Sequence, residues 1–324
     1  MYLNNPKPRV FTGYIRAFSV RYNALCIFNV FTMMKIALIG CGEVGSCYAE
    51  AWLAGGHRIV GICELRQDAQ MQARAQSFGS PLYAEPGAWL QEADLVVSAV
   101  FGHAALAVAR QALPHLRQDA AYADFTTASA ADMRAAADVA ASAGIPFTDV
   151  AIMGAIALLG ARTPLLCAGT GADAVVAFTA GCGAPAQAIA GQAGDAVRLK
   201  LLRSIMTKGM ESLAVECMVA AESMGLRASL YEVLSDMDRT PLTTFIDSFV
   251  RSHVLHAPRR LAEVREAREQ LVEAGLQPLV LDGVERLFAR TTQGIEAARE
   301  AGTFDVSDSV EARLAWLTPL ARTS

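Results

Sequence analysis

Met34-Lys-Ile-Ala-Leu-Ile-Gly-Cys-Gly-Glu-Val-Gly45 places an apolar run directly before a turn that contains three glycines. The run has the composition of a buried strand, and residues 46–54 after the turn favour a helix. In such a unit the first glycine permits a tight turn, the second lets phosphates approach the backbone, and the third lets the helix pack on the strand. Free N–H groups at the start of the helix then face the anion. The stretch therefore predicts a dinucleotide-binding βαβ unit.

The next strand supports this prediction. A second apolar run at residues 58–63 ends at Glu64, roughly the 20 residues beyond the turn at which such folds place a carboxylate on the ribose hydroxyls. Glu64 favours NAD because it repels a 2′-phosphate, whereas Arg66 could bind that phosphate in NADP. We expect NAD, with NADP as the alternative. The expected cofactor-binding residues are Gly40, Cys41, Gly42, Glu43, Val44, Gly45, Glu64, Arg66 and Val100. The competing interpretation is an ordinary βαβ unit with an unused turn.

Composition restricts the function classes. The 324 residues suit two domains, and 53% hydrophobic with 19% charged residues describe a globular chain. A net charge of −4 provides no basic field for nucleic acid or an anionic membrane, and we expect neither as a partner. The seven cysteines are odd in number and lack Cys-x-x-Cys pairs, which favours a reducing cytoplasm and argues against a metal site. A small-molecule substrate is the expected partner.

From Met34 onward the pattern alternates strand and helix, which predicts a doubly wound parallel sheet. Further strands are expected at residues 93–100, 120–126, 145–150 and 164–168, with helices at 104–116 and 130–143. The alternation stops at Gly194-Asp195, predicted as a turn and helix cap, and one long helix follows to Gly225. We expect a Rossmann-type domain at 34–193 and an all-α domain at 194–324, joined by that helix.

Residues 1–33 form a separate segment. They contain Lys7, Arg9, Arg16 and Arg21 but no acid, since the first carboxylate of the chain is Glu43. A basic, acid-free start is typical of an organelle transit peptide. Because the segment lacks the periodicity of a packed element, we instead expect a disordered tail or a misassigned start at Met33 or Met34.

The long helix carries two of the four lysines in a chain whose other basic residues are all arginine. Of these two basic side chains, only lysine can release a proton near neutral pH. Lys200, Ser204 and Lys208 recur every fourth residue, so they share one face of the helix. A solvated polar face explains this spacing equally well, and for Lys200 the spacing alone favours it.

Four segments together resemble the β-hydroxyacid dehydrogenase superfamily, which includes 3-hydroxyisobutyrate and 6-phosphogluconate dehydrogenases. These are Gly40-Cys-Gly-Glu-Val-Gly45, Asp124-Phe-Thr-Thr127, Asp149-Val-Ala-Ile-Met-Gly154 and Gly194-Asp-Ala-Val-Arg-Leu-Lys200. Lys208-Gly-Met and His256-Ala-Pro-Arg-Arg260 are similar to a poorly characterised branch labelled phosphogluconate-dehydrogenase-like. The resemblance implies a dimerising helical domain, an active site between the domains, and hydride transfer between NAD(P) and a small 3-hydroxy acid.

The resemblance also implies roles for individual residues. Lys200 matches the lysine that exchanges a proton with the reacting hydroxyl, and Thr126 matches a substrate-binding serine. Ser204 stands where the family normally has asparagine and is expected to take part in catalysis, and Thr127 is expected to bind substrate. The family's substrate loop usually contains a Pro, a Ser and a Gly-Gly pair. This chain has Ala151, Met153 and Ala155 in that loop, and only Gly154 of the Gly pair is kept. We therefore expect Met153, Gly154 and Ala155 to hold a bulkier or less polar substrate.

Arg259 and Arg260 follow Pro258, a residue suited to the first turn of a helix. Cations there oppose the helix dipole, which suggests a bound anion; the alternative is pairing with Glu263. Taken together, the sequence predicts an NAD(P)-dependent dehydrogenase acting on CH–OH groups, with imine reduction or a non-catalytic cofactor-binding scaffold as alternatives.

Overall fold

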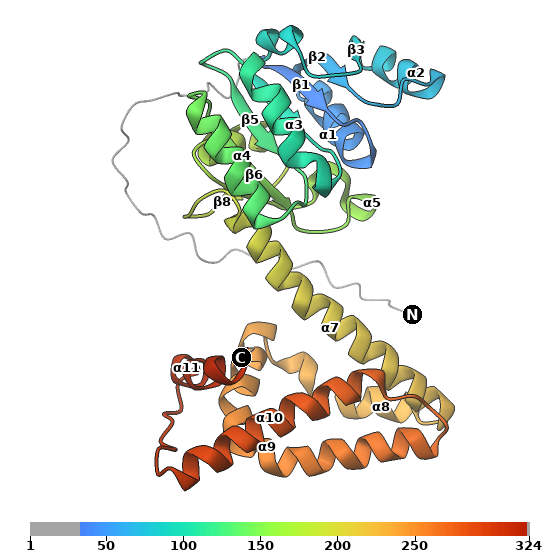
Figure 1. Cartoon of the computed structure of the whole chain (residues 1–324). Coiled ribbons are helices and arrows are strands. Elements are labelled where there is room, and N and C mark those ends of the chain that lie inside the picture. The colour runs from blue at the N-terminus through green and yellow to red at the C-terminus, as the bar shows by residue number, and fades with distance from the viewer. Residues whose placement is uncertain (1–32, 323–324) are drawn as a thin grey trace, which may run out of the picture. The chain divides into compact units, whose positions relative to one another are not determined.

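The computed structural model describes residues 33–322, so the predictions for residues 1–32 lie outside the described part of the chain. The chain divides into two compact units, one ending at Leu201 and the other starting at Leu202 (Figure 1). Both positions lie inside one helix, α7 (Asp195–Ser223). The domain boundary predicted at residue 194 is the turn before this helix.

The first unit contains an eight-stranded sheet in the order β3-β2-β1-β4-β5-β6-β7-β8. Its pairs are parallel except for β6 and β7, which run antiparallel. The strands are β1 (Lys35–Ile39), β2 (Arg58–Cys63), β3 (Leu82–Tyr83), β4 (Leu95–Ser98), β5 (Ala121–Asp124), β6 (Phe147–Ile152), β7 (Leu165–Ala168) and β8 (Ala186–Ala188). The chain's first strand therefore lies inside the sheet, as a doubly wound fold requires.

Helices cover both faces of this sheet, with a separate apolar core on each side. On one side α1 contributes Trp52 and α6 contributes Phe178. On the other side α3, α4 and the first turn of α7 pack their small side chains on the strands. The helices are α1 (Glu43–Ala54), α2 (Ala69–Ser77), α3 (Ala105–Ala112), α4 (Ala130–Ser142), α5 (Ile156–Leu159) and α6 (Ala172–Gly181), with short 3₁₀ turns η1 (Ala88–Glu92), η2 (Gly102–Ala104), η3 (Leu113–His115) and η4 (Gly160–Arg162). The predicted Rossmann-type architecture is confirmed.

The expectation of an entirely parallel sheet is wrong at one point. The connection from β6 to β7 contains only α5 and η4 and makes no crossover over the sheet, so β7 returns antiparallel. The sixth strand also continues to Ile152, beyond its predicted end at residue 150. Ala151 is therefore a buried strand residue and not part of a substrate loop.

The second unit is all helical, as predicted. After α7 it contains α8 (Arg227–Leu234), the turn η5 (Met237–Arg239), α9 (Leu242–Glu273), α10 (Leu279–Glu300) and α11 (Val310–Leu320). Val254, Ala257 and Leu261 of α9 and Ile295 of α10 are buried, and these two helices pack against each other. No helix among residues 33–322 has the length and apolarity to cross a bilayer.

Pro258 lies in the interior of α9 and not in its first turn, which corrects the prediction for this segment. The helix begins sixteen residues earlier, at Leu242, because the preceding Pro241 supplies its N-terminal boundary. Arg259 and Arg260 therefore do not face the positive end of a helix dipole. Arg259 instead pairs with Glu263 one turn later, which is the alternative that the sequence left open.

Candidate functional site

The three glycines between β1 and α1 have distinct surroundings. Gly40 has a φ of +89°, and a Cβ there would lie 2.4 Å from the carbonyl oxygen of Ala99. A Cβ on Gly45 would lie 2.0 Å from the carbonyl oxygen of Gly40, so helix and strand approach too closely for a side chain. Gly42 is exposed, and no atom lies within 4 Å of its added Cβ. Packing therefore requires Gly40 and Gly45, while Gly42 leaves open space at the start of α1.

The residue after β2 reaches this turn. The backbone N–H of Cys41 donates to the Glu64 carboxylate, with Cys41 N and Glu64 Oε2 3.0 Å apart. Arg66 pairs with Asp68 at 3.1 Å, and both side chains are largely exposed. Arg74 of α2, which the sequence did not indicate, donates from Nη1 to the carbonyl oxygen of Cys41 at 3.3 Å. Only the fold brings this guanidinium to the glycine turn, 33 residues away in sequence.

The residues present fit a dinucleotide. An open glycine precedes a helix start whose first N–H groups have no partner inside the helix. Glu43, in the first turn, and Val44 present their backbone here, and Glu64 lies beside the turn where a ribose would follow. Val100, also predicted to bind cofactor, follows β4 at the same edge of the sheet.

Three polar side chains lie in register on β4, β5 and β6, at the last residue of β4 and of β5 and in the middle of β6. Ser98 pairs with Asp124, and Asp124 pairs with Asp149. All three are fully buried. Burial raises the pKa of Asp124 to about 7, with nearby Asp149 adding to the rise and hydrogen bonds from Thr126 opposing it. Near neutral pH the Asp124 carboxyl is therefore poised between its protonated and ionised forms.

Thr126 is 4% exposed and ties two loops together. Its hydroxyl accepts the backbone N–H of Val100 at 3.2 Å, and its own N–H donates to Asp124 Oδ1 at 2.7 Å. The hydroxyl of Thr126, which was predicted to bind substrate, thus accepts a hydrogen bond from the backbone. The neighbouring Thr127 is exposed, and its hydroxyl makes no hydrogen bond to the backbone of the described residues.

Lys200 reaches that hydroxyl from the second turn of α7. Its Nζ lies 2.5 Å from Thr127 Oγ1 and donates to it. The side chain is half-buried, and burial lowers the pKa of Lys200 while the Asp149 carboxylate opposes this shift. Two of the predicted site residues, 73 positions apart, therefore meet at the carboxyl edge of the sheet.

Asp149 determines where α7 begins. Its Oδ2 accepts the backbone N–H groups of Gly194 at 2.9 Å and Val197 at 3.2 Å. Gly194 has a φ of +96°, and a Cβ there would lie 2.6 Å from the carbonyl oxygen of Ala130. Asp195, predicted as the cap, is instead the first helical residue and pairs with Arg198. The capping carboxylate comes from a strand, which the local sequence does not reveal.

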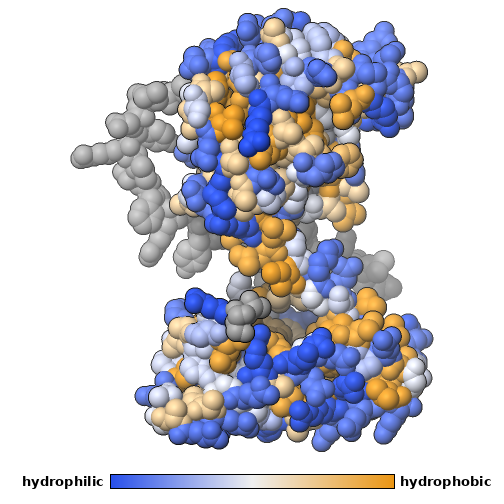
Figure 2. All heavy atoms as spheres, viewed as in Figure 1, coloured by the Kyte–Doolittle hydropathy of each residue, from blue (hydrophilic) through white to orange (hydrophobic). Residues whose placement is uncertain are grey.

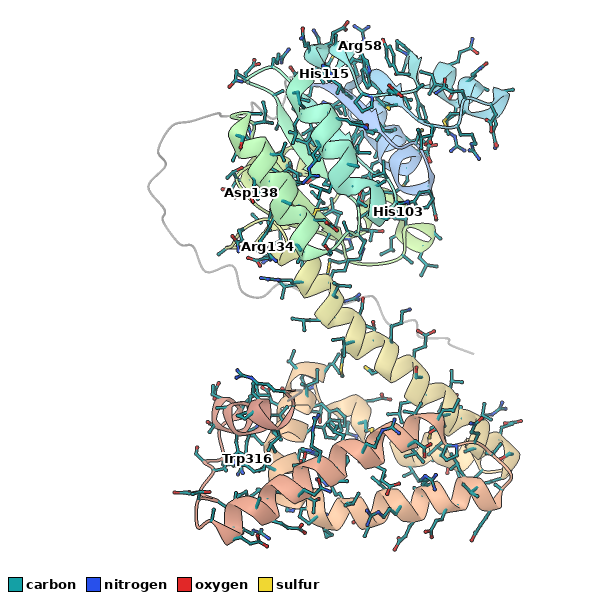
Figure 3. The ribbon with its side chains drawn as sticks, in the orientation of Figure 1. Arg58, His103, His115, Arg134, Asp138 and Trp316 are labelled. Atoms are coloured by element: carbon teal, nitrogen blue, oxygen red, sulfur yellow. The ribbon has the colours of Figure 1, made fainter. Side chains whose placement is uncertain are left out.

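Met153, Gly154, Ala155 and Ser204 are the remaining predicted site residues. Met153 is half-buried after β6 and donates its N–H to the carbonyl oxygen of Pro164 at 2.8 Å. Gly154 and Ala155 are exposed before α5. Ser204 follows Lys200 by one turn of the continuous helix α7. His103 is exposed in the turn after β4 (Figure 3).

Comparison with protein families identifies two regions. Residues 35–178 match the NAD binding domain of 6-phosphogluconate dehydrogenase. Residues 221–291 match a domain of unknown function, DUF1932. An uncharacterised 28.5 kDa protein of Methanothermus fervidus is 25% identical over 255 residues, which cover 79% of this chain and 98% of that protein.

Solved structures with this arrangement include a conserved hypothetical protein from Sinorhizobium meliloti, 26% identical, with a TM-score of 0.57 over 91% of this chain and 99% of the other. A conserved protein of unknown function, described as similar to 3-hydroxyacid dehydrogenases, is 27% identical with a TM-score of 0.57 over 80% of this chain and 97% of its own. An imine reductase from Aspergillus terreus shares the fold, with 18% identity and a TM-score of 0.67 over 81% of this chain and 94% of its own. The chain therefore carries an NAD-binding domain of the 6-phosphogluconate dehydrogenase type together with a DUF1932 domain, a pair that fits the resemblance to the β-hydroxyacid dehydrogenase superfamily.

Proposed function

We propose that this protein is an NAD(P)-dependent dehydrogenase that transfers hydride between nicotinamide and a small hydroxy acid, with Lys200 as its general acid and base. The observation that carries the proposal is the half-buried ammonium of Lys200 against the Thr127 hydroxyl, at the sheet edge that also bears the glycine turn. Ligands of open α/β folds bind at this edge.

Each group of this chain has a defined task in the proposed reaction. The bound dinucleotide supplies or accepts the hydride. The N–H groups at the start of α1 hold its diphosphate. Lys200 in its neutral form takes the proton of the substrate hydroxyl during oxidation and returns it during reduction. Thr127 orients the Lys200 amine through the hydrogen bond between them.

The lowered pKa of Lys200 predicts how oxidation depends on pH. A base must be deprotonated to accept a proton, so the rate of hydroxy-acid oxidation rises as the pH rises through the pKa of Lys200 and then levels off. Because burial lowers this pKa below its ordinary 10.5, the rise is complete at a lower pH than for an exposed lysine. Steady-state oxidation measured from pH 6 to 10 shows whether the profile has this form.

Replacing Lys200 tests the catalytic assignment. We expect Lys200→Met to reduce kcat/KM by about 10²- to 10⁴-fold while NAD(P)H affinity, measured by nicotinamide fluorescence, is unchanged. Lys208→Met is the matched control, since Lys208 lies on the same helix, is 77% exposed and pairs with Glu211. Full turnover by Lys200→Met would exclude the acid–base role. The scaffold alternative would be favoured if the wild-type protein bound NAD(P)H but turned over no hydroxy acid, imine or carbonyl substrate.

Parallel titrations with NADH and NADPH test the cofactor preference. We propose NAD, because the Glu64 carboxylate accepts the Cys41 N–H at the turn and would repel a 2′-phosphate. Arg74 and Arg66 are the groups that would favour NADP if the Glu64 carboxylate turned away. Tighter binding of NADPH than of NADH would contradict the proposed preference for NAD but would still support the dinucleotide site.

The substrate is proposed to be bulkier or less polar than 3-hydroxyisobutyrate. Met153, Gly154 and Ala155 follow β6 without the polar side chains that a small carboxylate would need. Turnover of 3-hydroxyisobutyrate at an ordinary dehydrogenase rate would contradict this. Imine reduction is the second candidate because solved reductive aminases and imine reductases share the fold, with TM-scores of 0.64 to 0.67. A cyclic imine reduced faster than any hydroxy acid is oxidised would establish it.

A homodimer is also proposed. Large apolar side chains of α7 are exposed in the single chain, among them Leu202 at 62%, Ile205 at 72% and Val215 at 60% (Figure 2). Such a surface on one helix is typical of a protein–protein interface.

A further inference from the structure

The helical unit contains a cavity of about 810 Å³ whose lining residues include neither the glycine turn nor Lys200. It is lined by α9, α10 and α11. Half-exposed apolar side chains form much of its wall, namely Phe249 at 50%, Leu287 at 46% and Leu314 at 47%. A pocket of this volume, mostly apolar with a few polar groups, has the character of a small-molecule site.

The polar groups of the cavity are cationic or neutral. Arg260 and Arg290 line it, together with His253, and no acidic residue of the described chain does so. Arg260 is half-buried and donates from Nη1 to the hydroxyl of Ser252 at 3.1 Å. Arg290 is exposed. The cavity therefore combines an apolar wall with excess positive charge.

Neither guanidinium is neutralised by a neighbouring acid. Within residues 33–322, Arg260 and Arg290 form no ion pair closer than 4.0 Å. The acids nearest in sequence pair elsewhere: Glu263, near Arg260, with Arg259, and Glu285, near Arg290, with Arg265. A half-buried cation without a counterion is costly, and an anionic ligand relieves that cost.

His253 adds a neutral donor and no negative charge. Thr291 donates its hydroxyl hydrogen to the carbonyl oxygen of Leu287, so it accepts the hydrogen bond from His253 Nε2 at 2.9 Å. Burial lowers the pKa of His253, and the charges of Arg260 and Arg290 lower it further. The imidazole ring packs edge-on against Phe288 at 4.6 Å.

We propose that this cavity binds an organic carboxylate with a hydrocarbon body, whose anionic group pairs with Arg260 and whose body lies against Phe249, Leu287 and Leu314. Arg290 adds attraction at the exposed side. The site is independent of the dinucleotide-binding turn and of the proposed hydride transfer.

Calorimetry on the full-length protein with three probes tests the ligand class. Octanoate carries both the charge and the hydrocarbon, 1-octanol carries the hydrocarbon alone, and acetate carries the charge alone. We expect octanoate to bind saturably, at least tenfold more tightly than 1-octanol, and acetate to show no binding over the same range. Equal affinity for octanoate and 1-octanol would overturn the assignment of an anion site.

Substitutions locate the site. Arg260→Met keeps an apolar stem of similar length, and we expect it to weaken octanoate binding by about tenfold or more, with a smaller loss for the exposed Arg290→Met. Arg259→Met is the matched control because the adjacent Arg259 pairs with Glu263 and does not line the cavity. Unchanged helix content by circular dichroism and an unchanged urea unfolding profile of Arg260→Met show that the helical unit of the variant is folded. Should Arg260→Met not fold, Arg260→Lys retains the charge and should bind octanoate within a few-fold of wild type.

Three outcomes overturn the proposal. One is equal octanoate affinity in wild type, Arg260→Met and Arg290→Met. Another is loss of octanoate binding in Lys200→Met but not in Arg260→Met, which would place the ligand at the proposed catalytic site. The third is a dimer that binds no octanoate, which would mean that a second copy of the chain fills the cavity.

Discussion

Gly42 and Gly45 belong to one turn, but their surroundings predict opposite consequences of mutation. Gly42→Ala places a methyl group in open space, so we expect unchanged stability and at least a tenfold loss of NAD(P)H affinity where the diphosphate approaches. Gly45→Ala forces a Cβ against the carbonyl oxygen of Gly40, and we expect it to lower the free energy of unfolding by about 2 kcal/mol or more. Urea unfolding and fluorescence titration of both variants distinguish the two effects. Equal loss of stability would contradict the separation of roles.

Asp124 predicts a pH dependence of stability. Its pKa is about 7 in the folded protein against an ordinary value of 3.8, so the folded chain binds more protons between these values. Stability contributed by this group is therefore full at acidic pH and falls as the pH rises from about 4 to 7, by about 4 kcal/mol at most.

The isosteric Asp124→Asn removes this titration and keeps an oxygen to accept the Thr126 N–H. Compared with wild type, we expect the variant to gain relative stability as the pH rises from 5 to 8 in urea unfolding. Because the other titrating groups are shared, the difference between the two proteins isolates Asp124. Parallel pH profiles would show that the carboxyl ionises in both states alike.

The site residues divide by the kind of information that reveals them. The glycines can be predicted because their roles follow from local chain geometry, and Lys200 stands out by the rarity of lysine in this chain and by the family resemblance. Asp149 and Arg74 were missed because their contacts join distant segments, at 45 and 33 residues of separation. Which of Thr126 and Thr127 contacts Lys200 depends on the direction of each side chain after β5. The sequence of two adjacent threonines does not predict that direction.

At the level of elements, the start of α7 depends on a carboxylate from β6. Asp149→Ala would leave the buried N–H groups of Gly194 and Val197 without an acceptor, and we expect a loss of about 1–3 kcal/mol of stability. Asp195→Ala is the matched control at the first residue of the same helix, and it should cost less. A larger loss for Asp195→Ala, measured by urea unfolding, would restore the sequence prediction that Asp195 is the cap.

The strands were predicted unevenly for a physical reason. Six apolar runs of four or more residues gave strands at or near their expected positions. β3 and β8 have two and three residues and were not predicted, since so short a strand carries no periodicity. The antiparallel direction of β7 was also missed, because it depends on a missing crossover and not on the composition of the strand.

For the molecule as a whole, the exposed apolar side chains of α7 predict self-association. We expect light scattering to give twice the chain mass of 34.4 kDa at micromolar concentration. Ile205→Lys and Val215→Lys each replace one of these exposed apolar side chains with a charge and should shift the mass toward the monomer. A wild type that remains monomeric at high concentration would contradict the proposed homodimer.

The position of β1 inside the sheet affects how this protein folds during its synthesis. Its neighbours are β2 and β4, so one edge of this apolar strand stays unpaired until the ribosome has added Ser98. At roughly 5–20 residues per second, that edge is exposed for several seconds of translation. Unpaired apolar edges are the surfaces on which nascent chains aggregate. Holdase chaperones should therefore engage this chain early, and release it once β4 has docked.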